Sequence, residues 1–259
     1  MPQQNIVDRR PLEAWQAEIL RLTAFPSPSA QLGEPTWWKD LVGEHPETKI
    51  SQPRVGGQQE EGRLDEGRKL VLRVEPTRID WLLTPIENRA REVNGIPTTG
   101  SFPESVQTFR QLMLRWFELA TCPPVQRLAF GATALLPVED LQAGYRQISA
   151  YLPFQLDPEG SSDFSYQINR PRDSTSGISG LRINRLSKWS VVRLTMGDIT
   201  FGPASVSYAA RHIRHACRLE LDINTAADFQ GELSREQLPQ IFRELVQLGQ
   251  EIVKDGDIP

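Results

Sequence analysis

The sequence predicts an α+β fold in which an antiparallel sheet of β-hairpins packs against helices. Residues 69–85 alternate apolar and polar side chains on either side of a turn at residues 75–78, the pattern of a hairpin. Residues 101–120 carry an apolar stripe at helical spacing behind a capping box formed by Ser101 and Glu104. Because hairpins and not crossover helices join the strands, the sheet is expected to be antiparallel.

The first 68 residues are predicted to hold one helix and a long Pro/Gly-rich segment. Between Pro11 and Pro26 apolar residues recur at helical spacing, at Leu12, Trp15, Ile19 and Leu22. Residues 26–69 are punctuated by Pro, Gly and charge clusters, so part of this segment is expected to be mobile. Exposing the adjacent indoles of Trp37 and Trp38 would be costly, and we expect them to pin the segment to the body or to a partner.

Residues 69–259 are predicted to form the α+β core. Further strands are expected at 126–136, 163–169 and 217–224, and further helices at 141–152 and 238–253. Two strands at 189–194 and 198–201 would flank Met196 and Gly197 as a hairpin, and 204–212 would form a helical turn or short helix. The order hairpin, helix, strand, helix then occurs twice, in residues 69–153 and 162–259, which suggests a loose internal duplication.

The composition is that of an ordinary globular protein. The 259 residues are 39% apolar and 24% charged, with a net charge of -4, and this length is enough to bury a core. The first thirty positions hold several charged residues, so no uncharged signal-peptide segment is predicted, and no apolar run has membrane-spanning length. Two cysteines give no disulfide framework. These features favour a cytoplasmic protein that is not embedded in a membrane.

Catalytic motifs do not stand out. The sequence lacks a nucleophile elbow, a phosphate-binding glycine loop and a zinc-protease motif, so it leans away from an enzyme and predicts no cofactor. Glu220 and Asp222 share one face of a predicted strand about 7 Å apart, which would suit a divalent cation or simply the polar face of the strand. His212, His215 and Cys217 are soft ligands, but structural zinc takes four protein ligands, and no metal site is predicted.

Positive charge is concentrated in residues 168–193. This stretch holds six basic residues against the single acid Asp173, with a Ser/Gly-rich run between two copies of Ile-Asn-Arg. It can be interpreted as the solvated side of a β-segment or as a surface for an anion or an acidic partner. The candidate partner-contact residues are therefore Trp37, Trp38, Arg170, Arg172, Arg182, Arg185 and Lys188.

Five segments resemble a sporadically distributed family of uncharacterised bacterial proteins of about this length. They are PTRIDWLLTP at 76–85, RLAFG at 127–131, INRLSKWS at 183–190, RLELDINT at 218–225 and EIVKDGDIP at 251–259. The resemblance carries no catalytic motif. It implies a bacterial, cytosolic, accessory-type protein of the kind found beside mobile or defence-related genes.

Together these observations predict a non-enzymatic accessory or regulatory protein that binds a protein partner, in a defence or mobile-element gene cassette. A nucleic-acid-binding protein that uses the basic 168–193 stretch is the first alternative. A metal-dependent hydrolase that uses Glu220 and Asp222 is the second. The sequence sets no oligomeric state.

Overall fold

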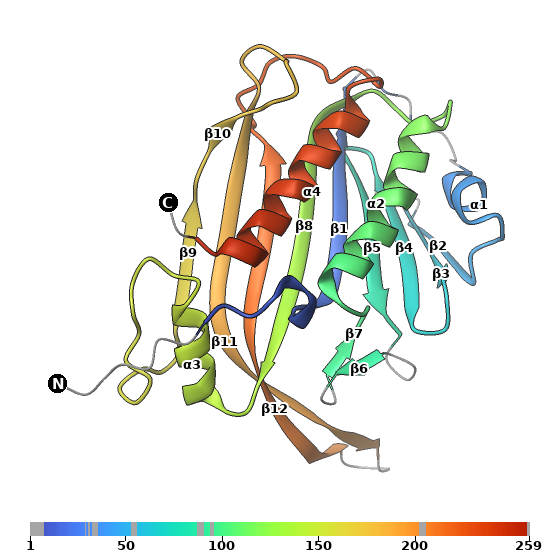
Figure 1. The fold of residues 1–259 in the computed structure, drawn as a ribbon. Helices are drawn as coiled ribbons and strands as arrows, with labels where there is room; N and C mark the ends of the chain where they lie inside the picture. The colour runs from blue at the N-terminus through green and yellow to red at the C-terminus, as the bar shows by residue number, and fades with distance from the viewer. Residues whose placement is uncertain are drawn as a thin grey trace.

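A computed structural model describes residues 8–28, 30, 32, 36–52, 56–86, 91–93, 96–201 and 206–257. These residues form a ten-stranded antiparallel sheet with two long helices on one face (Figure 1). The strand order is β10-β11-β12-β8-β1-β5-β4-β3-β2, with β9 also paired to β11, and β6 and β7 form a separate hairpin. The predicted α+β class and antiparallel sheet are confirmed.

The elements follow one another along the chain as η1 (Leu12–Ala14), β1 (Gln16–Pro26), α1 (Trp37–Val42), β2 (Thr48–Gln52), β3 (Gly57–Arg63), β4 (Arg68–Glu75), β5 (Arg78–Pro85), β6 (Arg91–Val93), β7 (Ile96–Thr98), α2 (Phe102–Glu118), β8 (Val125–Val138), α3 (Leu141–Ser149), β9 (Ser165–Asn169), β10 (Arg172–Asp173), β11 (Arg182–Phe201), β12 (Val206–Thr225) and α4 (Leu238–Asp255). The predicted 69–85 hairpin is confirmed as β4 and β5. The predicted helices at 101–120, 141–152 and 238–253 are confirmed as α2, α3 and α4. No helix in the described ranges is long and apolar enough to cross a membrane.

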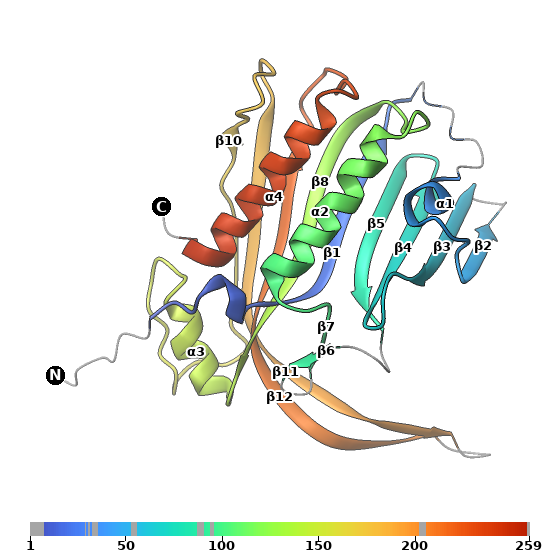
Figure 2. The same ribbon diagram turned by 45° about the vertical axis from the view of Figure 1, so that its right-hand side comes forward.

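The core lies between the sheet and the helices α2 and α4, which lie side by side (Figures 1 and 2). Strands β1 and β8 point Leu20, Leu22 and Phe130 toward the helices, and all three are fully buried. Phe242 of α4 packs edge-on against Phe130, with ring centroids 6.2 Å apart. The alternation of apolar and polar residues along each strand therefore separates a packed face from a second face, which no helix of the described residues covers.

The two halves of the sheet have the same strand order about the central β1–β8 pair. On one side β1 is followed by β5, β4, β3 and β2, and on the other β8 is followed by β12, β11 and the short strands β9 and β10. A long helix follows the last strands of each half, α2 in the first and α4 in the second. The predicted second copy of hairpin, helix, strand, helix is wrong, because α4 alone follows the β11–β12 hairpin.

Residues 16–26 form a central strand, so the predicted N-terminal helix is wrong. Leu20, Leu22 and Ala24 are fully buried, whereas Arg21 between them faces the other side of the sheet. β1 pairs with β5 along one edge and with β8 along the other, and this two-sided pairing overrides the local helical spacing. Much of the segment 26–69, part of which was expected to be mobile, also forms regular structure, as α1, β2 and β3.

Strands β11 and β12 are longer than predicted. Residues 182–201 are one strand that runs straight through Met196 and Gly197, where a turn was expected, and the ladder skips Arg211 of β12 at this point. Residues 206–212, which were expected to be helical, belong to β12, and positions 204–205 lie outside the described residues. Beyond Ser190 and His215 the ladders of β11 with β9 and of β12 with β8 end, and the two strands continue as a projecting ribbon (Figures 1 and 2). We call residues 191–201 and 206–214 the arm.

Candidate functional site

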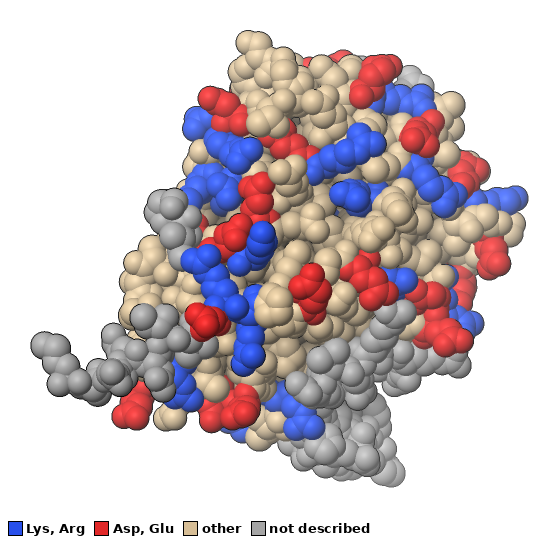
Figure 3. All heavy atoms as spheres, in the orientation of Figure 1, with Lys and Arg blue, Asp and Glu red and all other residues tan. Residues whose placement is uncertain are grey.

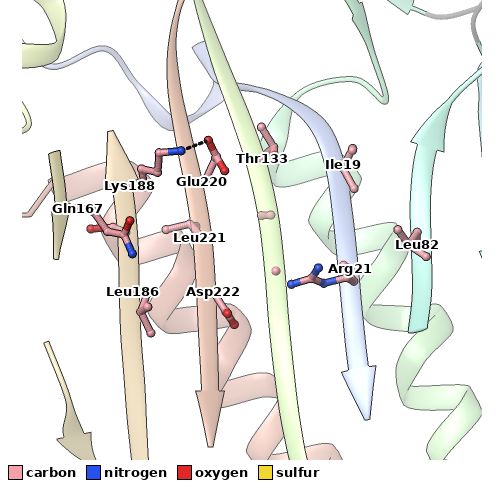
Figure 4. A pocket seen from close by; sticks show the side chains of 13 residues that line it. Ile19, Arg21, Leu82, Thr133, Gln167, Leu186, Lys188, Glu220, Leu221 and Asp222 are labelled. Carbon is pink, nitrogen blue, oxygen red and sulfur yellow. Dashed lines mark hydrogen bonds and ion pairs between the residues drawn. The ribbon is translucent and has the colours of Figure 1, made fainter. Parts of the chain in front are cut away.

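A groove of about 510 Å³ lies on the sheet face opposite α2 and α4, which we call the open face (Figure 4). It runs across β1, β8, β12 and β11, and its polar and charged lining includes Arg21, Thr133, Gln167, Lys188, Glu220 and Asp222. Ile19, Leu82 and Leu186 add apolar side chains. The groove thus combines both signs of charge with apolar surface.

Arg21 occupies the centre of this groove. Its neighbours Leu20 and Leu22 enter the core, so strand alternation directs Arg21 to the open face, where it reaches over β8 (Figure 4). The residue opposite in register is Gly131, and a Cβ there would lie 3.1 Å from Nη2 of Arg21. The glycine therefore leaves the space that the guanidinium fills.

The Arg21 guanidinium is left without a partner among the described residues. Its Nε is shielded from solvent and has no hydrogen-bond acceptor, and the side chain makes no ion pair there. A shielded donor without an acceptor costs free energy comparable to a lost hydrogen bond. An incoming carboxylate or carbonyl oxygen would remove that cost, and a carboxylate would add a charge-assisted bond.

The acidic side chains in the groove, and Glu18 beside it, are partly engaged with neighbours. Lys188 Nζ lies 3.2 Å from Glu220 Oε1, and Arg218 Nη2 lies 3.6 Å from Glu18 Oε2. Burial raises the pKa of Glu18, Arg218 opposes this rise and Glu220 adds to it. Asp222 Oδ1 accepts a 3.1 Å hydrogen bond from Asn224, which leaves its second oxygen for a donor from outside.

The metal-dependent hydrolase alternative would need a third protein ligand beside Glu220 and Asp222. Within the described ranges no group of three or more His, Cys, Asp and Glu residues is close enough to hold a metal ion. Glu220 pairs with Lys188, and the side chain of His212 lies outside the described residues. Burial raises the pKa of Cys217 and of Cys122 to about 12, which favours the protonated thiol over the reactive thiolate at neutral pH.

The basic residues of the 168–193 stretch differ in their surroundings. Arg170 makes two hydrogen bonds to Asp257, at 2.7 and 3.2 Å, and Lys188 pairs with Glu220. Arg185 is half-buried, and burial together with the nearby Arg172 lowers its pKa. Arg182 is exposed at the start of β11. On the helix-covered side, basic and acidic side chains are interspersed (Figure 3).

Trp37 and Trp38 lie in the core. They are 2% and 1% exposed, Trp37 Nε1 donates to the carbonyl of Thr121 at 3.2 Å, and Trp38 stacks on Trp81. The pair therefore pins α1 to the body, one of the two roles expected for it. Such burial leaves no indole surface for a partner in this conformation.

The central residues of the groove, Arg21 and Gly131, were missed by sequence reasoning. The one available signal was an arginine inside the apolar run ILRLTAF of residues 19–25, which was interpreted as a helix. Comparison with protein-family models, with curated proteins and with solved structures finds no match for this chain in any of the three. Function is therefore inferred from the residues of the chain itself.

Proposed function

We propose that the protein is a non-enzymatic accessory or regulatory protein that binds a protein partner in the groove of the open face. The observation that carries this proposal is the Arg21 guanidinium, held over Gly131 with a shielded Nε that has no acceptor among the described residues. The resemblance to a bacterial family suggests that the partner is encoded nearby, in a defence or mobile-element gene cassette.

The charges of the groove favour a protein segment over a nucleic acid. Arg21 and Lys188 are balanced by Glu220 and Asp222, which gives the lining a net charge of zero. A phosphate backbone would meet two carboxylates there, whereas a peptide can match both signs in register. The fitting occupant is an extended segment or loop that offers a carboxylate to Arg21 and a basic or amide side chain to Asp222.

Apolar contacts would supplement this charge match. Ile19 and Leu82 lie beside Arg21, and Leu186 lies at the β11 side of the groove (Figure 4). All three are partly exposed on the open face, so a partner side chain that covers them would remove apolar area from water. Such a centre of apolar contacts within polar surroundings is typical of protein–protein interfaces.

The test compares two charge reversals on the same face. Arg21→Glu alters the groove, whereas Arg73→Glu alters an exposed arginine of β4 that lies outside its lining. Tagged protein and both variants are used to isolate partners from the native host, with and without nuclease, and bound proteins are quantified by mass spectrometry. We expect one protein to be lost from Arg21→Glu, retained by Arg73→Glu and unaffected by nuclease.

Melting curves of both variants show whether the fold is intact. Retention of the same proteins by Arg21→Glu and the parent would overturn the proposal. So would release by nuclease of the one protein whose binding depends on Arg21.

A further inference from the structure

A second hollow, of about 650 Å³, lies at the root of the arm, and we call it the cleft. Its lining comes from three separate parts of the chain, because Arg10 precedes η1, Arg146 belongs to α3, and Arg214 and His215 belong to β12. Glu139 is the one acidic residue of that lining. The fold therefore gathers arginines that are far apart in the sequence.

The charge of the cleft differs from that of the groove and of three further hollows. Three arginines less one glutamate give its lining a charge of +2, without counting His215. The groove and two further hollows are neutral by the same count, and a fifth, with Glu75 as its charged residue, is at -1. Because the whole chain carries -4, this local excess of positive charge is a specific feature of the arm root.

Several of these cations are available to a ligand. Arg146 is exposed and makes no hydrogen bond or ion pair with any described residue. Arg193 is likewise exposed, and it pairs in register with His215 at the start of the arm. Arg10 Nε donates a hydrogen bond to Gln147 Oε1 at 3.2 Å, which orients the guanidinium group. The other N–H groups of this guanidinium remain for a ligand. Asp140, the N-cap residue of α3, already accepts from the backbone of Ala143.

The shape beside the cleft favours duplex DNA over an acidic peptide. The arm continues from the cleft as a two-stranded ribbon past the end of the sheet (Figures 1 and 2). The major groove of B-DNA admits a two-stranded β-ribbon, and arginine forks fit phosphate oxygens. An acidic peptide would use the positive charge but would give the projecting ribbon no role.

We propose that the cleft and the arm bind the phosphate backbone of duplex DNA. Arg10, Arg146 and Arg214 contact phosphates, Arg193 extends this contact along the arm, and the ribbon enters the adjacent groove. Arg193 is the residue of the 168–193 stretch that takes part in this surface, whereas Arg170 and Lys188 of that stretch are already paired with acids.

The experiment measures binding of the full chain to a short labelled duplex of arbitrary sequence by fluorescence anisotropy, over a series of salt concentrations. The variant of the proposed surface combines Arg146→Glu in the cleft with Arg193→Glu at the start of the arm, and we call it the cleft variant. The control is Lys39→Glu with Lys254→Glu, two exposed lysines outside the cleft lining, which changes the net charge of the chain by the same amount. Circular dichroism shows whether each variant is folded, and single Arg146→Ala replaces the cleft variant if it is not.

The logarithm of the parent's binding constant should fall linearly with the logarithm of the salt concentration. The slope of this line should be about -0.9 for each phosphate contact. The cleft variant should bind at least about tenfold more weakly, and its salt slope should be smaller in magnitude by about 2. The salt slope of Arg146→Ala should be smaller by about 1. The control should retain most of the affinity. The proposal is overturned if the parent does not bind at low salt, if cleft and control variants weaken equally, or if poly-glutamate binds the cleft and the duplex does not.

Discussion

The two halves of the sheet differ most in their long hairpins. The hairpin of the first half, β4 and β5, has eight residues in each strand, whereas β11 and β12 have twenty each. Both hairpins occupy the same place relative to the centre, because β5 lies beside β1 and β12 lies beside β8. The arm is therefore the part of the β11–β12 hairpin that has no counterpart in the β4–β5 hairpin, and most of the groove and the arm-root cleft belong to the half that carries it.

Each half nevertheless has an aromatic cluster of its own. In the first half Trp81 and Trp116 pack with ring centroids 6.1 Å apart, and in the second Tyr151 stacks on Trp189 at 5.6 Å. Phe242 of α4 contacts Phe109 and Phe117 of α2, and both aromatic clusters belong to one buried hydrophobic core. This continuity predicts one cooperative unfolding unit.

The largest expected effect comes from the two indoles. Trp116→Ala and Trp189→Ala each remove a fully buried ring, and each should lower the free energy of unfolding by about 3–5 kcal/mol. Chemical denaturation followed by circular dichroism and by fluorescence should give coincident transitions in the parent and in both variants. A loss below about 1 kcal/mol in one half, or separate transitions, would show that the halves unfold independently.

A smaller effect is expected at the edge of the second half. Asp257 is buried and accepts hydrogen bonds from Arg170 and from Tyr166, so Asp257→Asn should cost about 1–3 kcal/mol. Glu220→Gln breaks the more exposed ion pair with Lys188 and should cost less than about 1 kcal/mol. Thermal melts measure both variants. Equal losses of stability would show that the buried Arg170–Asp257 pair contributes no more than the exposed Lys188–Glu220 pair.

Removing the arm should make the two hairpins alike. Thr195 and Ile213 are partners across the ladder, so residues 196–212 can be replaced by Asn-Gly, a two-residue hairpin turn. In the described part of the deleted segment the backbone ladder pairs the two strands with each other, so the stability should change by less than about 1 kcal/mol. A loss of several kcal/mol in denaturant titrations would instead make the arm part of the core.

The smallest effect is a pH dependence at Glu18, which lies on β1 and faces Arg218 of β12. Burial raises its folded pKa above 4.5, so between 4.5 and the raised value the folded state binds more protons than the unfolded state. Stability therefore falls as pH rises through that window. Glu18→Gln should raise stability at neutral pH by less than about 1 kcal/mol, and the gain should vanish below pH 4.5.

Glu47→Gln provides a control of opposite sign for this pH series. A hydrogen bond from Arg63 lowers the pKa of Glu47, so this carboxylate stabilises the fold above its unfolded pKa. Its removal should decrease stability at neutral pH. A gain at Glu18→Gln that persists at low pH would contradict the ionisation account.

Elements with long, regular patterns could be predicted from the sequence. The stripe of α2, the alternation of β4 and β5 and the stripe of α4 each reflect one buried face, and each was predicted within a few residues. β1 was missed because its neighbours β5 and β8 are distant in the sequence, and their pairing decides its conformation. The arm was missed because Gly197, which is a paired position inside β11, was interpreted as part of a turn.

The candidate site was harder to predict for the same reason. The neutralising partners of the basic stretch, Asp257 and Glu220, lie 87 and 32 positions from Arg170 and Lys188, where local composition gives no sign of them. Arg21 and Gly131 become a site through the register of β1 with β8. Strand alternation did correctly place Glu220 and Asp222 on one face.

The groove proposal is tested most directly by the affinity of the isolated partner for Gly131→Ala. The added methyl group would lie 3.1 Å from Nη2 of Arg21 and must displace the guanidinium, while alanine is tolerated by the strand backbone. Isothermal titration should show binding weaker by at least about tenfold, or about 1.4 kcal/mol, with an almost unchanged melting temperature. Equal affinities for the parent and Gly131→Ala would contradict a partner site centred on Arg21.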